Sequence, residues 1–369
     1  MRIAILYNDD FSHLSPGVNR SSQDAILGVV ASFERALAAR GAAVFAFPVG
    51  ADAFGFSDDF LDAAPDLIVN LCESFGGDAR GELIVPALLD LLRVPYTGSG
   101  PLALALALHK HKAKEILRAR GIPTPEWQLI ERLDALDKLD VPLPAIVKPA
   151  HEDASIGIDR RSLVKTRSEL AWACERVLTE HRQPALVERF IDGRELNVGL
   201  WGAPPEILPI HEIDFSHLDP AHPHVVTYAA KWDEAAPEYQ ATHSVPCRLD
   251  PQALDRVRQV ARGAFEALEL RDYGRVDIRL AADGSPYVIE VNPNCDLSLD
   301  AGFARAAQAA GIDYESLVWR LVEIAMSRYA RPSHDGEGLG AAGPDARGNR
   351  RAPAGRGRLR PGAGPARSE

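Results

Sequence analysis

The stretch GRVDIRLAADGSPYVIEVN, residues 274–292, predicts two β-strands joined by a tight turn at Asp283-Gly284. Its polar residues stand two positions apart on each side of the turn: Arg275 and Asp277, then Glu290 and Asn292. Side chains on a strand alternate between faces, so each pair shares one face of its strand. If the strands pair through the turn, these faces coincide and bring together two carboxylates, an amide and a guanidinium. Oxygen ligands of this kind suit Mg²⁺, although a hairpin with a solvated polar face explains the local pattern equally well.

The composition is that of a soluble globular protein, with 46% hydrophobic and 25% charged residues in a chain of 369. This length exceeds what one hydrophobic core usually covers, which predicts two or three packed domains. The net charge is −11, and eight arginines stand against four acidic residues from Arg331 onward, so the rest of the chain is more acidic still. An acidic body argues against a nucleic-acid partner, because binding a phosphate backbone requires a basic face.

The cysteine and hydropathy patterns favour a cytoplasmic protein. The four cysteines are far apart and form no CxxC pair: Cys72, Cys174, Cys247 and Cys295. This pattern fits free thiols in a reducing compartment better than a disulfide framework or a zinc site. The apolar run at 1–7 is too short for a signal peptide, and the run at 102–108 stops at His109, well short of membrane-spanning length. We therefore expect no membrane partner.

The first 103 residues alternate strand and helix signals. Apolar runs predict strands at 3–7, 44–49 and 67–71. Helical periodicity predicts one helix that begins at Ser21 or Ser22 and ends at Gly41, and a second helix at 83–92. This βαβ rhythm indicates a small parallel sheet, so residues 1–103 are expected to form an N-terminal domain.

The rest of the chain is expected to form two further domains, 104–192 and 193–330, and a tail. Predicted helices and strands of the central domain are 102–120, 145–148, 168–180 and 185–190. The third domain is expected to contain a helix capped by Asp250 with Pro251 in its first turn, the hairpin, and a last helix at 314–329. Residues 331–369 have almost no large apolar side chain, which predicts disorder.

Three segments ahead of the hairpin have features of a nucleotide site. Lys148 ends an apolar strand, where a charge needs a partner such as a phosphate. The polar loop 151–157 contains a glycine, and backbone N–H groups of such a loop can close over phosphates. The extended segment 186–191 could hold adenine by its backbone, and Glu195 could reach the ribose hydroxyls. Each segment also has an ordinary structural explanation when it is considered alone.

Taken in order along the chain, these polar residues resemble the motif set of the ATP-grasp superfamily, and the D-alanine–D-alanine ligases look like the nearest branch. The resemblance rests on Lys110, Lys148, Ser155, Glu188, Glu195, Lys231, Arg275, Asp277, Glu290 and Asn292. It extends roughly over 70–330 and is densest at PYTGSG (95–100), at 146–149 and in the hairpin. The implied fold is α/β, of the α+β ATP-grasp type, with a parallel-sheet pre-ATP-grasp domain followed by a two-lobed ATP-grasp module.

The resemblance implies that ATP lies between the second and third domains. The residues it implies as ATP ligands are Lys110, Lys148, Ser155, Gly157, Glu188, Phe190, Ile191, Glu195 and Lys231. The lysines would hold the phosphates, the loop residues would close over them, and the two glutamates would contact the adenine amino group and the ribose. Backbone groups at Phe190 and Ile191 would lie beside the adenine.

The resemblance also implies a metal site and a reaction. Asp277, Glu290 and Asn292 match the ligands of two Mg²⁺ ions, with Mn²⁺ as an alternative, and Arg275 and Lys231 match catalytic residues. A carboxylate would attack the γ-phosphate of ATP to give an acyl phosphate, and an amine would then attack the acyl carbon. The implied activity is that of a carboxylate–amine ligase acting on small-molecule or peptide-like substrates, such as amino acids.

Two substrate-binding motifs of that branch are replaced in this chain. The branch has a Gly-Gly-x-Ser-x-Glu segment whose glutamate binds the first substrate's ammonium, but no glutamate occurs at 7–12 or 21–24. Acids that would have to substitute are Asp9, Asp10 and Asp24. Where the branch binds the second substrate's carboxylate, Asp296 and Asp300 would repel a carboxylate and favour an amine or a cationic group. We therefore expect the same chemistry on another substrate pair rather than D-Ala–D-Ala synthesis.

Two alternatives from other classes remain, a small-molecule kinase of the ATP-grasp type and a non-catalytic ATP-binding protein. A non-catalytic protein is expected to lose metal ligands, and Asp277, Glu290 and Asn292 are all present. Arg275 beside the metal strand is better explained by an acyl intermediate than by phosphoryl transfer alone. The sequence leaves the oligomeric state open, with a homodimer as one arrangement.

Overall fold

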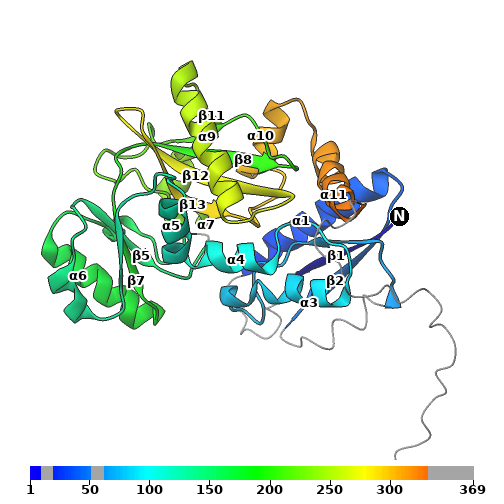
Figure 1. Cartoon of the computed structure of the whole chain (residues 1–369), viewed down its shortest axis with the longest axis horizontal. Coiled ribbons are helices and arrows are strands. Elements are labelled where there is room, and N and C mark those ends of the chain that lie inside the picture. Colours follow the sequence, from blue (N-terminus) through cyan, green and yellow to red (C-terminus); the bar gives the residue numbers. More distant parts are fainter. Residues whose placement is uncertain (10–19, 51–61, 154, 331–369) are drawn as a thin grey trace, which may run out of the picture. The chain divides into compact units, whose positions relative to one another are not determined.

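A computed structural model describes residues 1–9, 20–50, 62–153 and 155–330 of the chain (Figure 1). The tail predicted at 331–369 lies outside the described residues, as does Asp10. Within the described ranges, no helix is both long enough and apolar enough to cross a membrane. The division into domains at residues 103, 192 and 330 stays a prediction.

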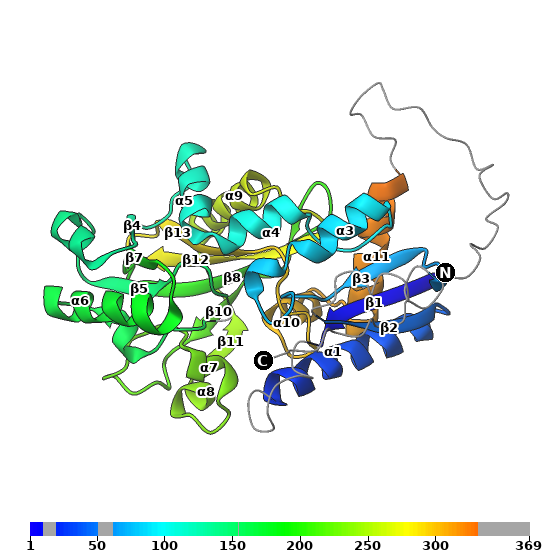
Figure 2. The ribbon, with the colours of Figure 1, turned by 90° about the horizontal axis from the view of Figure 1, so that it is seen from below.

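The first sheet is parallel and confirms the predicted βαβ arrangement. Its strands β1 (Arg2–Asn8), β2 (Ala43–Val49) and β3 (Leu67–Asn70) lie in the order β2-β1-β3. Alternate residues of β1 enter two cores: Ile3 and Ile5 pack towards α1 (Arg20–Ala39) and α11 (Tyr314–Ala330), whereas Ala4 and Leu6 pack towards α3 (Ile84–Leu92). Figure 2 shows α1 and α3 on opposite faces of this sheet. The last helix thus returns to cover the first sheet.

Two helix predictions for the first 120 residues are wrong in detail. Helix α1 begins at Arg20, so Ser21 and Ser22 lie inside it rather than at its cap. The single helix predicted at 102–120 is two helices, α4 (Pro101–Leu108) and α5 (Lys110–Ala119). The break occurs because the backbone of His109 leaves helical geometry, with φ −81° and ψ 73°, and the N–H of Lys110 donates instead to the carbonyl of Ala150. Lys110 therefore begins a new helix next to the loop that follows β5.

The second sheet is antiparallel and has the order β4-β7-β5-β6. Its strands are β4 (Trp127–Ile130), β5 (Ala145–Pro149), β6 (Leu163–Val164) and β7 (Ala185–Arg189). Helix α6 (Arg167–Arg176), extended by a turn of π-helix at Val177–His181, packs on one face of the sheet through Leu170, Ala173 and Val177. The sequence predicted β5, β7 and α6, and missed β4 and β6.

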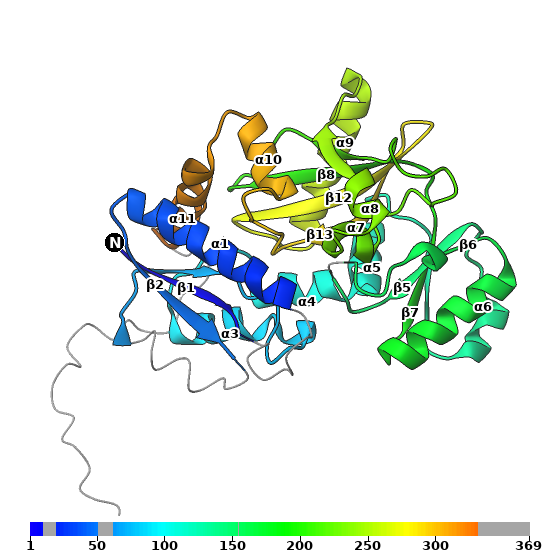
Figure 3. The same ribbon diagram turned by 180° about the vertical axis from the view of Figure 1, so that it is seen from behind.

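The third sheet contains the predicted hairpin and has the order β11-β10-β8-β12-β13, with β9 paired to β8. Its strands β8, β12 and β13 are labelled in Figure 3. Its strands are β8 (Gly193–Trp201), β9 (Glu206–Ile207), β10 (His211–Asp214), β11 (His243–Pro246), β12 (Tyr273–Ala281) and β13 (Pro286–Asn292). Helix α9 (Pro251–Ala267) packs on this sheet and is capped as predicted, with the Asp250 side chain accepting from the N–H groups of Gln252 and Ala253. Within the described residues, the other α-helices are α7 (Tyr228–Trp232), α8 (Pro237–Ala241) and α10 (Gly302–Ala309).

Candidate active site

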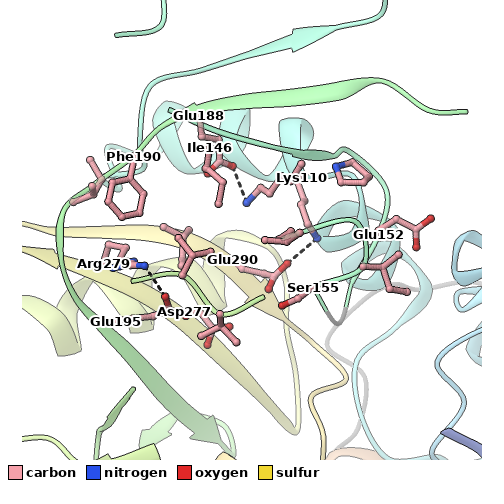
Figure 4. A pocket seen from close by; sticks show the side chains of 18 of the residues that line it. Lys110, Ile146, Glu152, Ser155, Glu188, Phe190, Glu195, Asp277, Arg279 and Glu290 are labelled. Atoms are coloured by element: carbon pink, nitrogen blue, oxygen red, sulfur yellow. Dashed lines mark ion pairs between the residues drawn. The ribbon is translucent and has the colours of Figure 1, made fainter. Parts of the chain in front are cut away.

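A cleft with many charged side chains lies between the second and third sheets and has an empty volume of about 780 Å³, part of which is open solvent (Figure 4). The residues predicted for the nucleotide and metal sites that line it are Lys110, Lys148, Ser155, Glu188, Phe190, Ile191, Glu195, Lys231, Asp277 and Glu290. Gly157, Arg275 and Asn292 lie next to lining residues rather than on the wall itself. The structure therefore brings the predicted residues together from both sheets and from the loops between them.

The hairpin pairs as the sequence predicts. Arg275 lies opposite Asn292, and Asp277 lies opposite Glu290, with a register shift just beyond Asp277. The Asp277 carboxylate accepts from Arg275 Nε at 2.7 Å and Nη2 at 2.9 Å, and from Asn292 Nδ2 at 3.0 Å. Asn197 of the neighbouring strand β8 donates to the same carboxylate at 2.9 Å. Four hydrogen bonds from three side chains thus fix the position of the Asp277 oxygens.

Lys110 and Glu290 form a buried ion pair at the start of α5. Lys110 Nζ lies 2.7 Å from Glu290 Oε1 and 2.8 Å from Asp153 Oδ1. Burial opposes the charge on both groups, but the neighbouring opposite charges outweigh it. Asp153 and Glu290 raise the pKa of Lys110, and the lysines, chiefly Lys110 and Lys148, hold the pKa of Glu290 well below its usual range. Both groups are therefore charged at neutral pH.

Lys148 has a protein partner in this structure, the carboxylate of Glu188. Their ion pair has an N–O distance of 3.0 Å, and Lys114 approaches the same carboxylate at 3.2 Å. Glu188 is almost fully buried, which would raise its pKa, but the two lysines lower it. Burial and the charge of Lys148 lower the pKa of Lys114 to about 8 despite the opposing effect of Glu188.

Sequence reasoning missed Lys114 and Arg279. Lys114 stands four residues after Lys110, so the two share a face of α5, and this spacing could have identified it. Arg279 continues the alternation of Arg275 and Asp277 along β12, lines the cleft, and pairs with Glu195 at 2.9 Å. Burial raises the pKa of Glu195, and Arg279 opposes that effect.

The loop after β5 has a backbone that requires glycine at one position. Gly157 has φ +78°, and an added Cβ would lie 2.6 Å from Pro149 Cγ and 2.9 Å from the His181 ring. Ser155, two residues earlier, has φ +62° and lines the cleft beside Lys110 and Glu152. A side chain at 157 would therefore displace the loop from the position in which Ser155 faces the cleft.

A group of acidic side chains surrounds the loop that follows β13. Asn294 donates to the carbonyl of Cys72 and to Glu82 Oε1, both at 2.9 Å, which places β3 and its following loop beside this segment. Burial raises the pKa of Glu82 well above its usual range. Desolvation by the surrounding protein, together with repulsion from Asp296 and Asp153, raises the pKa of Glu73 to about 7. The Glu73 side chain is nevertheless exposed.

Asp296 and Asp300, which the sequence predicts to repel a substrate carboxylate, are both exposed, and Glu73 and Glu82 are further acids in this region. Asp9 follows β1 and does not line the cleft, and the side chain of Asp24 lies outside the described part of the chain. In the D-alanine–D-alanine ligases a glutamate binds the ammonium of the first substrate. Among the described residues of this chain, no replacement for that glutamate is identified.

Residues 116–323 match the family model described as "D-ala D-ala ligase C-terminus". The chain belongs to this ligase family. It is 35% identical over 295 residues to a D-alanine–D-alanine ligase of Chromohalobacter salexigens, covering 77% of this chain and 87% of that protein. It is 32% identical over 253 residues to a D-alanine–D-alanine ligase of Pelotomaculum thermopropionicum, covering 66% and 75%. An uncharacterized Sinorhizobium fredii protein, y4sG, is 35% identical over 273 residues, covering 73% and 78%.

Solved structures of the family share the fold. A D-alanine–D-alanine ligase of Bacillus anthracis superimposes with a TM-score of 0.68 at 25% identity, covering 89% of this chain and 98% of that one. A second structure of that enzyme, complexed with ATP, superimposes equally well at 23% identity. The α/β ATP-grasp fold and the assignment to an ATP-dependent ligase that forms a carbon–nitrogen bond are therefore confirmed.

Proposed function

We propose that the protein uses ATP and Mg²⁺ to convert a carboxylate into an acyl phosphate and then couples it to an amine or to a substrate with a cationic group. The observation that supports this proposal is the convergence, on one cleft, of Lys110, Lys148 and Lys231 with the carboxylates of Asp277 and Glu290. Lysines attract a triphosphate, and carboxylates bind the cations that accompany it. Such opposite charges side by side suit a metal-bound nucleotide.

Within this proposal, different residues of the cleft bind the phosphates, the adenine and the ribose of ATP. Lys110, Lys148 and Lys231 bind the phosphates, and Ser155 and Gly157 belong to the loop that closes over them. Glu188, beside Lys148, and the backbone at Phe190 and Ile191 hold the adenine, and Glu195 binds the ribose. Lys114 and Lys148 hold the pKa of Glu188 below its usual range, whereas burial raises the pKa of Glu195 and its pair with Arg279 opposes that rise.

The hairpin residues fit magnesium. Asp277 and Glu290 face each other across the strands and already lie against the cations of Arg275 and Lys110, so this position is suited to positive charge. Among the described residues, no group of three or more His, Cys, Asp or Glu side chains converges on one point. Phosphate oxygens and Asn292 would therefore complete the coordination of two ions. Bound Mg²⁺ offsets the negative charge on the transferring phosphoryl group.

Arg275 is the residue proposed to act on the acyl carbon. Its guanidinium is fixed by two hydrogen bonds to Asp277, and this carboxylate raises the pKa of Arg275 despite burial, so the side chain stays charged. A preorganised donor of this kind stabilises the oxyanion that forms when the amine attacks.

The substrate side of the cleft favours a positively charged group. Asp296, and Glu73 above about pH 7, add negative charge where the second substrate would bind, and a carboxylate there would meet repulsion. Two of the three relatives described above are named D-alanine–D-alanine ligases, so D-alanine is the reference substrate, but an amine with a second cationic group matches these acids better.

Phosphate release from ATP and Mg²⁺ tests the proposed reaction. Carboxylates and amines, including D-alanine and dibasic amines, are supplied singly and in pairs, and product masses are measured. The ligase reaction requires two acceptors and yields a product equal to their sum minus water. Phosphate transfer to one acceptor, with a phosphorylated product, would instead establish the kinase alternative.

The pKa of Glu73 gives this site an expected pH dependence. The carboxylate is ionised above about pH 7 and neutral below it, so the KM for a cationic amine should rise as the pH falls through 7. Glu73→Gln should give a higher KM that stays flat across this range. Glu206→Gln, an exposed acid on β9, is the matched control and should retain the wild-type profile. An unchanged profile in Glu73→Gln would refute the role of this acid.

A further inference from the structure

The loop over the phosphates and the segment that contains Lys231 come from different sheets but are joined to each other. The phosphate loop, residues 155–158, follows β5 of the second sheet. The Lys231 segment, residues 227–241, contains α7 and α8 and lies between β10 and β11 of the third sheet. Ser155, Ile156 and Lys231 line the same cleft, so both segments border the proposed nucleotide site.

Two contacts reach the Lys231 segment, one from the phosphate loop itself and one from the turn that directly follows it. The N–H of Tyr228 donates to the carbonyl of Ile158 at 2.9 Å, at the start of α7. Arg160 Nε donates to Glu238 Oε1 at 2.6 Å, at the start of α8. The Glu238 side chain is 9% exposed, and its hydrogen bond with Arg160 is the main cause of its lowered pKa. A nearly buried carboxylate thus depends on an arginine from the other sheet.

Arg160 is held in place by a network on its own side. It lies in a short 3₁₀ turn, Arg160–Ser162, that begins with a capping box formed by Asp159 and Ser162. Arg176 of α6 forms an ion pair with Asp159 and donates to the Gly157 carbonyl at 3.2 Å and to Ser162 Oγ at 3.3 Å. One buried arginine therefore fixes both the phosphate loop and the turn from which Arg160 extends.

Two further hydrogen bonds hold the start of the Lys231 segment in place. Thr227 caps α7 by accepting from the N–H of Ala230, and Arg279 of β12 donates to the carbonyl of His224 just ahead of it. Lys231 then stands one turn along α7 from Tyr228, which contacts Ile158. Movement of the phosphate loop would move the start of the helix that contains Lys231.

We propose that Arg160 and Glu238 are positioning residues whose ion pair joins the Lys231 segment to the phosphate loop, so that Lys231 and Ser155 close on the nucleotide together. This inference rests on the proposed function, since it assumes that both segments contact the phosphates. Joint closure matters for a ligase because an acyl phosphate is hydrolysed when water enters the site. The ion pair lies outside the cleft wall, so neither Arg160 nor Glu238 is itself a proposed ligand of ATP.

Arg160→Ala and Glu238→Ala test the pair by the ratio of phosphate released to amide formed. Each variant is expected to raise this ratio and to lower kcat by roughly 10- to 100-fold, because misplaced catalytic groups are costly even when the change is remote. The KM for ATP should change little, since the adenine and ribose contacts remain. Arg160→Lys, which retains a charge opposite Glu238, should recover part of the loss. Arg194→Ala, which breaks the 2.6 Å pair with Glu212 on β10, is the matched control and should retain the wild-type ratio.

Amide hydrogen exchange with a non-hydrolysable ATP analogue and Mg²⁺ gives a second measurement, which needs neither the carboxylate nor the amine substrate. In the wild type the analogue should protect 155–162 and 227–241 together, whereas in Arg160→Ala it should protect the first segment without the second. Protection of both segments in Arg160→Ala, with an unchanged phosphate-to-amide ratio, would overturn the positioning role. Protection of neither segment in the wild type would instead contradict the nucleotide site of the proposed function.

Discussion

Replacing Glu290 by alanine is expected to abolish turnover while the protein still folds. The variant removes one of the carboxylates proposed to bind Mg²⁺, so charge on the transferring phosphoryl group is no longer offset. A loss of about 4 kcal/mol of transition-state stabilisation corresponds to roughly a 10³-fold fall in kcat. The measurement is kcat with ATP over a range of Mg²⁺ concentrations, together with thermal unfolding.

The structure explains why folding should survive this change. Lys110 loses its partner at 2.7 Å but keeps Asp153 at 2.8 Å, so no buried lysine is left without a carboxylate. Glu212→Ala is the matched control, since it breaks an ion pair with Arg194 in the same sheet but outside the cleft. That control should retain activity. Wild-type turnover in Glu290→Ala would rule out the metal assignment.

The elements that the sequence predicts correctly are those with a strong local signal. The hairpin has alternating apolar residues and an Asp-Gly turn, and α9 has an Asp cap followed by Pro at its first position. Strand β8 lacks such a signal, because Glu195 and Asn197 interrupt its apolar residues to face the site. Its strand conformation depends on pairing with β12, about 80 residues further on, which no local pattern records.

The residues of the candidate site also divide into those that the sequence predicts and those that it does not. Lys110, Lys148 and Glu290 were predictable because their order and spacing match a known motif set, and the cleft brings them together. The acidic residues around the proposed site of the second substrate were only partly predictable. Glu82 reaches this side through Asn294, a residue 212 positions away, and the pKa of Glu73 depends on Asp153 and Asp296 from other segments. Such charges arise from packing and cannot be read from one stretch of sequence.

Arg275→Ala is expected to lower kcat by roughly 10²- to 10³-fold, the effect of removing one oxyanion donor, or about 3–4 kcal/mol. The reason is geometric: Asp277 fixes both Nε and Nη2 of the guanidinium, so the donor is oriented before the reaction begins. Arg275→Lys should recover only part of the activity, because an ammonium retains the charge but cannot form both hydrogen bonds. Arg256→Ala, an exposed arginine on α9, is the matched control.

A second effect of the same substitution separates catalysis from metal binding. Asp277 keeps Asn197 and Asn292 as donors when Arg275 is removed, and loss of the neighbouring positive charge should strengthen its attraction for Mg²⁺. If Arg275 acts on the acyl carbon, extra Mg²⁺ will not restore kcat, and phosphate release will continue while amide formation fails. If Arg275 only orients Asp277, phosphate release and amide formation will fall by the same factor. Single-turnover measurement of both products distinguishes these outcomes, and equal losses would contradict the oxyanion role.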